Sequence, residues 1–367
     1  MRLQLTAVVL LLPSLAAAQT DVERGGEASL RVYADDDHVT VVTPEVAARS
    51  PIGRYFAIEA GATVDVVTAA SIDVTSQASS APFHEQRVEG DLTGTWAPLP
   101  TLALRLHGTG SIENDYRSLH VGGGLRLDLA RRNGTLDLDY TAIIDQVGRA
   151  GDPWFDRPRR GHRLVAAYTQ VLGRDTLLDL VVDGELIDGY QASPYRYVPI
   201  VNPGGARLYT LDESVPNLRV RGAGLVRLRQ ALPRNLFLHV DYRFYADTWA
   251  VTSHTASARL VASLADRRIT LGLSARGYLQ GAASFQRASY VDDGGGAPAW
   301  RTRDRALGRV REVSAGAVGD IALGRPPLAD RPHLVAGVDL IQFWWLDFPL
   351  QNERRALITS LCITTPF

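Results

Sequence analysis

Apolar and polar residues alternate with a period of two along most of this chain. Between residues 55 and 66, every second residue from Phe56 to Val66 is apolar, whereas the residues between them include Glu59 and Asp65. Because successive side chains of a strand point to opposite faces, this pattern predicts strands with one apolar and one polar face. Fourteen such segments are found, at 55–66, 88–96, 102–112, 119–129, 136–140, 164–168, 178–186, 220–228, 236–244, 256–264, 269–279, 315–323, 334–340 and 357–367.

Three features favour a membrane barrel over a soluble sandwich. The segments are long for soluble sheets, and their polar faces carry many charges, as a wet lumen requires. The connections also alternate between short ones (98–100, 132–134, 173–175, 233–235 and 266–267) and long ones (68–82, 146–161, 189–217 and 281–304). Among the short ones, Asn133-Gly134 is the strongest hairpin signal. The pattern predicts an all-β, transmembrane, antiparallel up-and-down β-barrel of about 14 strands, with 12 or 16 possible, whose short turns face the periplasm.

The N-terminus has the features of a signal peptide. Arg2 precedes the short apolar run Leu5–Leu12, and Ala16-Ala17-Ala18 offers a cleavage site, so residues 1–18 are predicted to be removed on export. Residues 19–54 contain one β-like stretch, Val39–Val42, and are predicted to form a periplasmic segment or a plug. Residues 55–367 would form the barrel. No later run of about 18 apolar residues predicts a membrane-spanning helix, so the expected location is the bacterial outer membrane.

Composition and charge restrict the kinds of partner and cofactor that can be expected. The formal net charge is −1, which gives no global attraction to nucleic acid, and Cys362 is the single cysteine, so no internal disulfide is possible. We expect no cofactor and no metal site; Asp35-Asp36-Asp37-His38 could offer cation ligands, but a solvated turn is the simpler interpretation, because the remaining ligand spacing of a calcium loop is absent. The expected partners are outer-membrane lipid and lipopolysaccharide. The terminal Phe367 further predicts recognition by the barrel assembly machinery.

Parity assigns the polar faces to the lumen, and the two halves of the chain differ in charge. The first seven segments supply a predicted acidic wall, formed by Glu59, Asp65, Glu89, Asp91, Asp128, Asp137, Asp139, Asp179, Asp183 and Glu185, with Arg87, Arg105, Arg126 and Arg163 among them. The last seven supply a predicted basic wall, formed by Arg219, Arg221, Arg227, Arg229, Arg243, Arg259 and Arg276, with Asp241, Glu312, Asp320 and Asp339. Facing walls of opposite charge could orient charged solutes in a pore. The same residues could instead pair across a packed interior.

Catalysis is not predicted, although Ser253 and His254 follow Asp247. Adjacent residues of a strand point to opposite faces, so a serine nucleophile and its base could not meet there. No G-x-S-x-G motif occurs either. We therefore assign no catalytic residue.

Several short motifs resemble a family of proteobacterial outer-membrane proteins that is known only as a domain of unknown function. The matching pieces are Tyr33–Val39, Val64–Ser71, Ser193–Arg196, Pro216–Arg219, Tyr242–Trp249, Ser253–Thr255 and Tyr278–Gln280. The chain has Ala250 and Ala69 at places where the family commonly has glycine. The resemblance implies an outer-membrane barrel and supplies no substrate.

The sequence therefore favours a channel or transporter for small polar or charged solutes. A plugged barrel with a structural or surface-interaction role is the alternative. FadL-like transport of apolar molecules is a third possibility, but it would require an apolar inward pocket, and the inward faces predicted here are charged.

Overall fold

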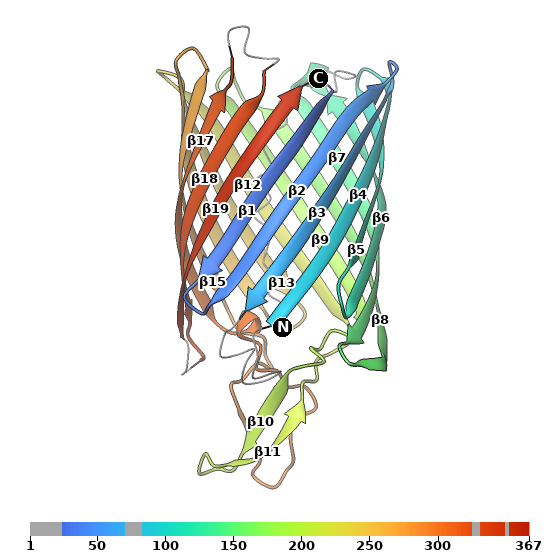
Figure 1. The fold of residues 1–367 in the computed structure, drawn as a ribbon, viewed down its shortest axis with the longest axis vertical. Helices are drawn as coiled ribbons and strands as arrows, with labels where there is room; N and C mark the ends of the chain where they lie inside the picture. The colour runs from blue at the N-terminus through green and yellow to red at the C-terminus, as the bar shows by residue number, and fades with distance from the viewer. Residues whose placement is uncertain (1–23, 70–82, 325–330, 349–351, 367) are drawn as a thin grey trace.

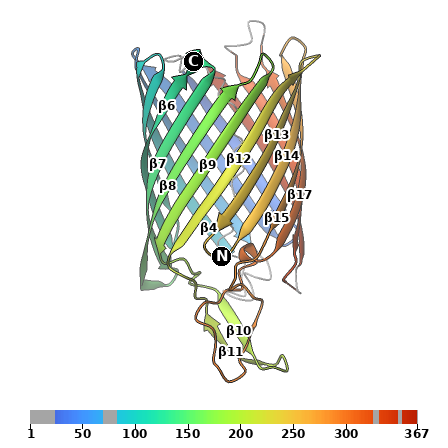
Figure 2. The same ribbon diagram turned by 180° about the vertical axis from the view of Figure 1, so that it is seen from behind.

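The computed structural model describes residues 24–69, 83–324, 331–348 and 352–366, which form one closed β-barrel (Figures 1 and 2). Its strands are β1 (Gly25–Asp35), β2 (Val39–Ile52), β3 (Phe56–Ala69), β4 (Phe83–Leu99), β5 (Leu102–Ile112), β6 (Tyr116–Leu129), β7 (Gly134–Arg149), β8 (Asp152–Val171), β9 (Thr176–Gly189), β12 (Arg219–Leu232), β13 (Leu236–Asp247), β14 (Thr252–Leu264), β15 (Ile269–Gln280), β17 (Val310–Ala322), β18 (His333–Trp345) and β19 (Glu353–Pro366). The predicted signal peptide and Phe367 lie outside the described residues.

The wall has sixteen strands rather than the fourteen that the sequence pattern suggested. All fourteen predicted segments are barrel strands, and β1 and β2 complete the ring because β1 pairs with β19 on one side and β2 on the other. Residues 25–52 are therefore part of the wall, which corrects the prediction that residues 19–54 form a periplasmic segment or plug. Pro44 and Pro51 lie within β2. Proline cannot donate to a strand ladder, which explains why this segment does not read as a central strand.

The alternation of the sequence corresponds to the two faces of the wall. Large apolar side chains on the outer face are exposed, and Leu106 reaches 75%. A continuous exposed apolar exterior of this kind is stable in lipid and not in water. The intervening residues, which include most of the charged ones, point into the lumen. No helix among the described residues is long and apolar enough to cross a membrane.

The two ends of the barrel differ. One end, here called the turn end, carries the start of β1, the end of β19 and the five short connections named in the sequence. At the hairpin between β6 and β7, Ala130, Arg131 and Arg132 have positive φ, whereas Asn133 does not, so the left-handed residues precede the predicted Asn133-Gly134 turn. The opposite end, here called the loop end, carries the connections after β3, β9 and β15.

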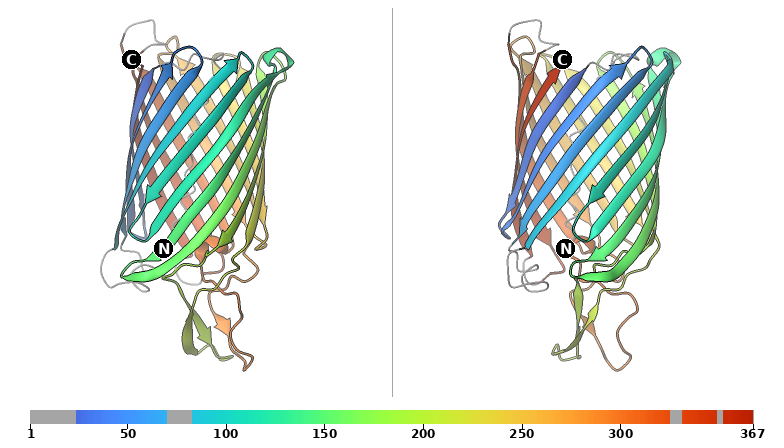
Figure 3. Two further views of the ribbon diagram at one scale, coloured as in Figure 1. Left: turned by 90° about the vertical axis from the view of Figure 1, so that its right-hand side faces the viewer. Right: turned by 45° about the vertical axis from the view of Figure 1, so that its right-hand side comes forward.

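The predicted long loop 146–161 is absent, because β7 and β8 extend into a hairpin that turns at 150–151. The two longest connections instead fold together beyond the rim. They form a small sheet of β10 (Tyr197–Val201), β11 (Arg207–Asp212) and β16 (Tyr290–Val291), with the 3-10 turn η2 (Arg305–Leu307) nearer the barrel. Figure 3 shows this loop sheet projecting from the loop end. Its buried core is Val198, Ile200 and Tyr290.

Candidate functional site: the lumen and its loop end

All residues of the two predicted walls lie on barrel strands, at positions that face the lumen. Many of them form ion pairs between strands that are neighbours or are separated by one strand. Arg163 lies 2.8 Å from Asp183, and their side chains are 49% and 26% exposed. Arg105 pairs with Asp137, while His107 lies 3.2 Å from Asp139. These charges contact each other and remain open to the lumen, so the interior is not a dry packed core.

The predicted basic wall is partly neutralised by its neighbours. Arg227 lies 3.1 Å from Asp241 on β13, and both Arg227 and Arg229 approach Asp179 on β9. Arg221 lies 3.2 Å from Glu185, and Arg276 pairs with Glu312. The basic and acidic walls therefore meet at the β9–β12 boundary, where their side chains form ion pairs with each other.

Arg219 is not part of an open wall, because it is buried at the loop end. Its guanidinium pairs with Asp247 and stacks over Trp249, 4.1 Å from the ring centroid. The Tyr245 hydroxyl donates to the same Asp247 carboxylate at 2.8 Å. Arg219 and Asp247 belong to two motifs of the family resemblance, Pro216–Arg219 and Tyr242–Trp249. The structure brings these two motifs together in a buried cluster that joins β12 to the end of β13.

A second buried cluster of charges lies at the loop end, where β1 ends and β19 begins. Arg354 lies 3.2 Å from Asp35 and also pairs with Asp37, which is 3.5 Å from Arg305 of η2. The Trp345 ring contacts both Arg305 and Arg354. Backbone amides of Asp37 and Val39 donate to Asp35. The Asp35–His38 segment is therefore a turn, as the simpler interpretation of the sequence expected, but the side chains of Asp35 and Asp37 are largely buried against arginines rather than solvated.

The long connection between β9 and β12 is attached to the rim of the barrel at the β5–β6 turn. The Tyr195 hydroxyl donates to Asp115, and burial together with this carboxylate raises the pKa of Tyr195 to about 12. Arg196 lies 2.8 Å from Glu213 and 3.1 Å from Asp304, so it joins the two long connections to each other. Arg354 and Glu213 were not predicted from the sequence, but the motifs Tyr33–Val39 and Ser193–Arg196 contain their partners.

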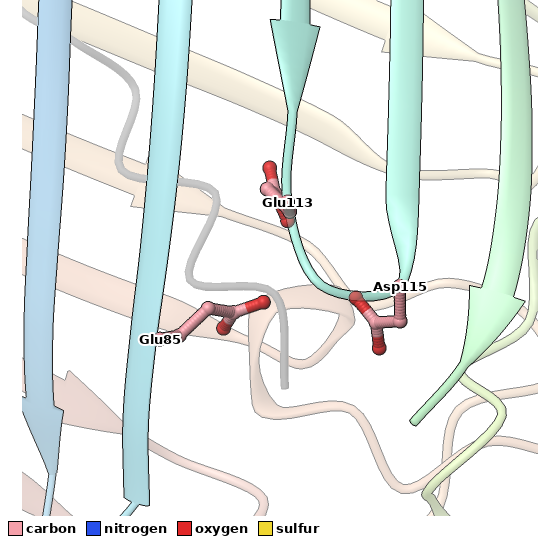
Figure 4. A group of neighbouring side chains, drawn as sticks. All are labelled: Glu85, Glu113 and Asp115. Carbon is pink, nitrogen blue, oxygen red and sulfur yellow. The ribbon is translucent and has the colours of Figure 1, made fainter. Parts of the chain in front are cut away.

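Three carboxylates gather at the loop end of the lumen. Glu85 of β4 points toward Glu113 and Asp115 of the β5–β6 turn, and one oxygen of each lies within 4.8 Å of the others (Figure 4). Oxygen ligands of this kind suit a hard cation such as Ca²⁺. However, Arg87 Nε lies 3.8 Å from Glu113 and Tyr195 already donates to Asp115, so protein donors partly compensate the cluster.

The structure does not bring Ser253 and His254 together. Ser253 is buried on the inner face, whereas His254 lies on the outer face, where its Nδ1 is 2.7 Å from the Tyr242 hydroxyl. The opposite parity expected from the sequence is confirmed, so these two residues do not form a nucleophile–base pair.

Comparison with solved structures shows a barrel of the same class. A protein described as a bacterial polysaccharide outer membrane secretin is 8% identical, with a TM-score of 0.50 over 95% of this chain and 100% of that chain. CdiB from Acinetobacter baumannii is 8% identical, with a TM-score of 0.49 over 94% and 60%. OpdK of Pseudomonas aeruginosa, solved with vanillate, is 9% identical, with a TM-score of 0.45 over 96% and 100%. At such identities the likeness concerns the fold alone.

The chain has the fold of an outer-membrane β-barrel. Residues 155–320 also match a family described as "Protein of unknown function (DUF3570)", which confirms the resemblance noted in the sequence over that range. The motifs from Ser193 to Gln280 fall inside the match, and Tyr33–Val39 and Val64–Ser71 fall outside it. No curated protein matches the chain. With its lipid-compatible exterior, this fold places the protein in the outer membrane of a bacterium.

Proposed function

We propose that this barrel is a water-filled channel for small polar or charged solutes. The observation that carries the proposal is the middle of the lumen, where paired charges such as Arg163 and Asp183 keep substantial exposure. The sixteen-strand wall adds support, because barrels of 16–18 strands enclose an aqueous channel whereas small barrels are filled by their own side chains. A charged inner face also does not favour transport of apolar molecules.

The two ends of the barrel and its apolar exterior also suggest an orientation in the membrane and the partners of the wall. The turn end would face the periplasm and the loop end the outside, as in other barrels with short periplasmic turns. The exposed apolar exterior would contact outer-membrane lipid and lipopolysaccharide. Recognition by the barrel assembly machinery through Phe367 stays a proposal that rests on the sequence.

The direct test is conductance of the purified full-length protein in a planar lipid bilayer. The proposal expects stepwise, ohmic current in simple salt solutions. A correctly folded barrel that inserts and passes no ions would contradict it.

That contrary result would favour a surface-interaction barrel, because the loop sheet has its own core and projects beyond the rim. Its two long connections are also anchored to the wall at Asp37 and Asp115. Deleting residues 203–206 at the tip of this sheet would then impair partner binding without affecting barrel assembly.

A further inference from the structure

Two three-strand arcs face each other across the lumen. In the ring of sixteen, β3 and β13 are eight positions apart, as are β2 and β12, and β4 and β14. Strands separated by half of a closed ring lie on opposite sides of it. We call β2–β4 the acidic arc and β12–β14 the basic arc, for the reason given next.

The inward charges of the two arcs mirror each other. The acidic arc presents six carboxylates and two arginines, which are Glu45, Glu59, Asp65, Glu85, Glu89, Asp91, Arg49 and Arg87. The basic arc presents six arginines and two carboxylates, which are Arg219, Arg221, Arg227, Arg229, Arg243, Arg259, Asp241 and Asp247. The sequence predicted opposite half-walls, and the closed ring concentrates the imbalance on two arcs that stand directly opposite.

Ion pairing removes most of these charges from action on a solute, but not all. Among the described residues, no ion pair within 4.0 Å involves Glu45, Glu59, Glu85, Asp91 or Arg49 on the acidic arc. On the basic arc, the same is true of Arg243 and Arg259. Glu59 and Asp91 are exposed to the lumen. The unpaired charges are therefore four carboxylates against Arg49 on the acidic arc and two arginines on the basic arc.

Four of these unpaired residues, Glu45, Asp91, Arg243 and Arg259, lie at similar heights, whereas Glu59 is the fourth residue of β3 and lies nearer the turn end. Counted from the turn end of each strand, Glu45 is the eighth residue of β2 and Arg243 the eighth of β13. Asp91 is the ninth of β4, and Arg259 the sixth of β14. A solute in mid-lumen would thus have carboxylates on one side and guanidinium groups on the other.

Nearby charges weaken this field without cancelling it. Arg31 faces the lumen from β1, beside the acidic arc, and Glu27 lies on the same face of that strand. Arg49 faces Glu59 in the β2–β3 ladder, so both residues lie close to the turn end, where they are exposed and their charges offset each other outside the mid-lumen. Asp339 lies on β18, between the arcs rather than on either of them. None of these residues reverses the sign of its side of the lumen.

We propose that the mid-lumen prefers zwitterionic solutes, such as free amino acids or short peptides. The ammonium group would turn toward Glu45 and Asp91, and the carboxylate toward Arg243 and Arg259. A transverse field orients a dipolar solute and raises its local concentration, whereas it gives a neutral solute of equal size no such gain. This inference rests on the proposed channel function and names its solute class.

The experiment measures release of two solutes from liposomes that contain the full-length protein. The probes are glycylglycine, which is zwitterionic, and N-acetylglycinamide, which is neutral and of similar size. At low ionic strength we expect glycylglycine to leave about threefold faster. At about 1 M salt the preference should vanish, because the Debye length falls to about 3 Å.

The deciding variant is Glu45→Gln/Asp91→Asn/Arg243→Gln/Arg259→Gln, which removes two charges of each sign. It should abolish the preference while N-acetylglycinamide still passes. The matched control, Arg163→Gln/Asp183→Asn, also preserves net charge but removes a paired couple, and it should keep the preference. If the fourfold variant fails to fold, Asp91→Asn/Arg243→Gln carries the same test and should at least halve the preference.

The outcomes separate the two proposals. If neither solute leaves the wild-type liposomes, the channel function is wrong. If both leave at equal rates, or if the preference survives in the folded variant, the channel function stands and the zwitterion inference is wrong.

Discussion

The same chemical pair, an arginine with an aspartate, occurs in two settings in this barrel. At the loop end, Arg354 and Asp35 have side chains that are 5% and 0% exposed, and they are enclosed by Tyr33, Trp345 and the turn to β2. In mid-lumen, Arg163 and Asp183 lie at a similar separation but remain 49% and 26% exposed. Only the amount of water around the pair differs.

The sequence allowed two interpretations of the inward charges, as structural pairs or as the lining of a pore. The difference in burial favours the first at the loop end and the second in mid-lumen. A buried charge depends on its partner, since removing one member leaves the other unpaired without solvent. A pair that is open to water contributes little stability, because solvent screens its attraction. The loop-end pairs therefore hold the fold and anchor the loops, while the mid-lumen charges face the pathway.

The largest expected effect is loss of a loop-end arginine. Arg354→Gln should lower the free energy of unfolding by about 3–5 kcal/mol, because Asp35 and Asp37 lose their buried partner. Arg163→Gln is the matched change in mid-lumen and should cost less than about 1 kcal/mol. Urea unfolding in lipid vesicles measures both. Similar losses in the two variants would contradict the assignment by burial.

A charge on the outer face should have the next largest effect. Leu138→Arg places a guanidinium against hydrocarbon and should cost about 2–4 kcal/mol. Asp137→Asn, one residue away on the inner face, opens a half-exposed pair with Arg105 and should fold nearly normally. The same unfolding assay compares them. Equal damage from the two substitutions would show that the inner and outer faces are misassigned.

A smaller gain is expected at the loop end, in the turn between β13 and β14. Ala250 has a φ of 69°, in the left-handed region that favours glycine, and it stands where the resembled family commonly has glycine. Ala250→Gly should raise the free energy of unfolding by about 1 kcal/mol, because the side chain is strained in this conformation. Ala246→Gly, in the neighbouring strand, should instead destabilise the barrel.

The smallest effect concerns the anchor of the loop sheet at alkaline pH. Burial and Asp115 raise the pKa of Tyr195 above its ordinary value of 10.0, to about 12. Because the folded pKa is the higher one, the contact stabilises fully below about pH 10 and is lost as the pH rises through about 12. The tyrosinate absorbance of the wild type minus that of Tyr195→Phe should therefore titrate near pH 12. A titration near pH 10 would mean that Tyr195 is free in solution.

Most of the wall could be predicted from the sequence, because period-two alternation depends on local residues alone. The interior faces of the fourteen segments follow from parity, and so do Glu59 and Arg243 as lumen residues. β1 and β2 were missed because Pro44 and Pro51 interrupt the pattern, and because the outer face of β1 carries small residues such as Ala28 and Ala34. Their place in the wall depends on closing the ring, which is a long-range condition.

The pairing of the charges could not be predicted, because it depends on register and on loops distant in sequence. Arg354 meets Asp35 across the closure of the barrel, and Arg196 meets Asp304 between two long connections. Parity alone placed Arg219 in an open basic wall, whereas the fold of the loop end buries it beside Trp249. Burial is therefore what separates structural charges from those open to the lumen, and only the three-dimensional structure supplies it.

The central claim is that water fills the middle of the lumen, and cysteine accessibility tests it most directly. In a Cys362→Ser background, Asp91→Cys and Leu92→Cys place thiols on the inner and outer faces of β4 at the same height. The account predicts that a charged, membrane-impermeant thiol reagent modifies Asp91→Cys in the reconstituted protein and leaves Leu92→Cys unmodified. Protection of both thiols would contradict a water-filled lumen. Modification of Leu92→Cys alone would show that the inner and outer faces of the wall are interchanged.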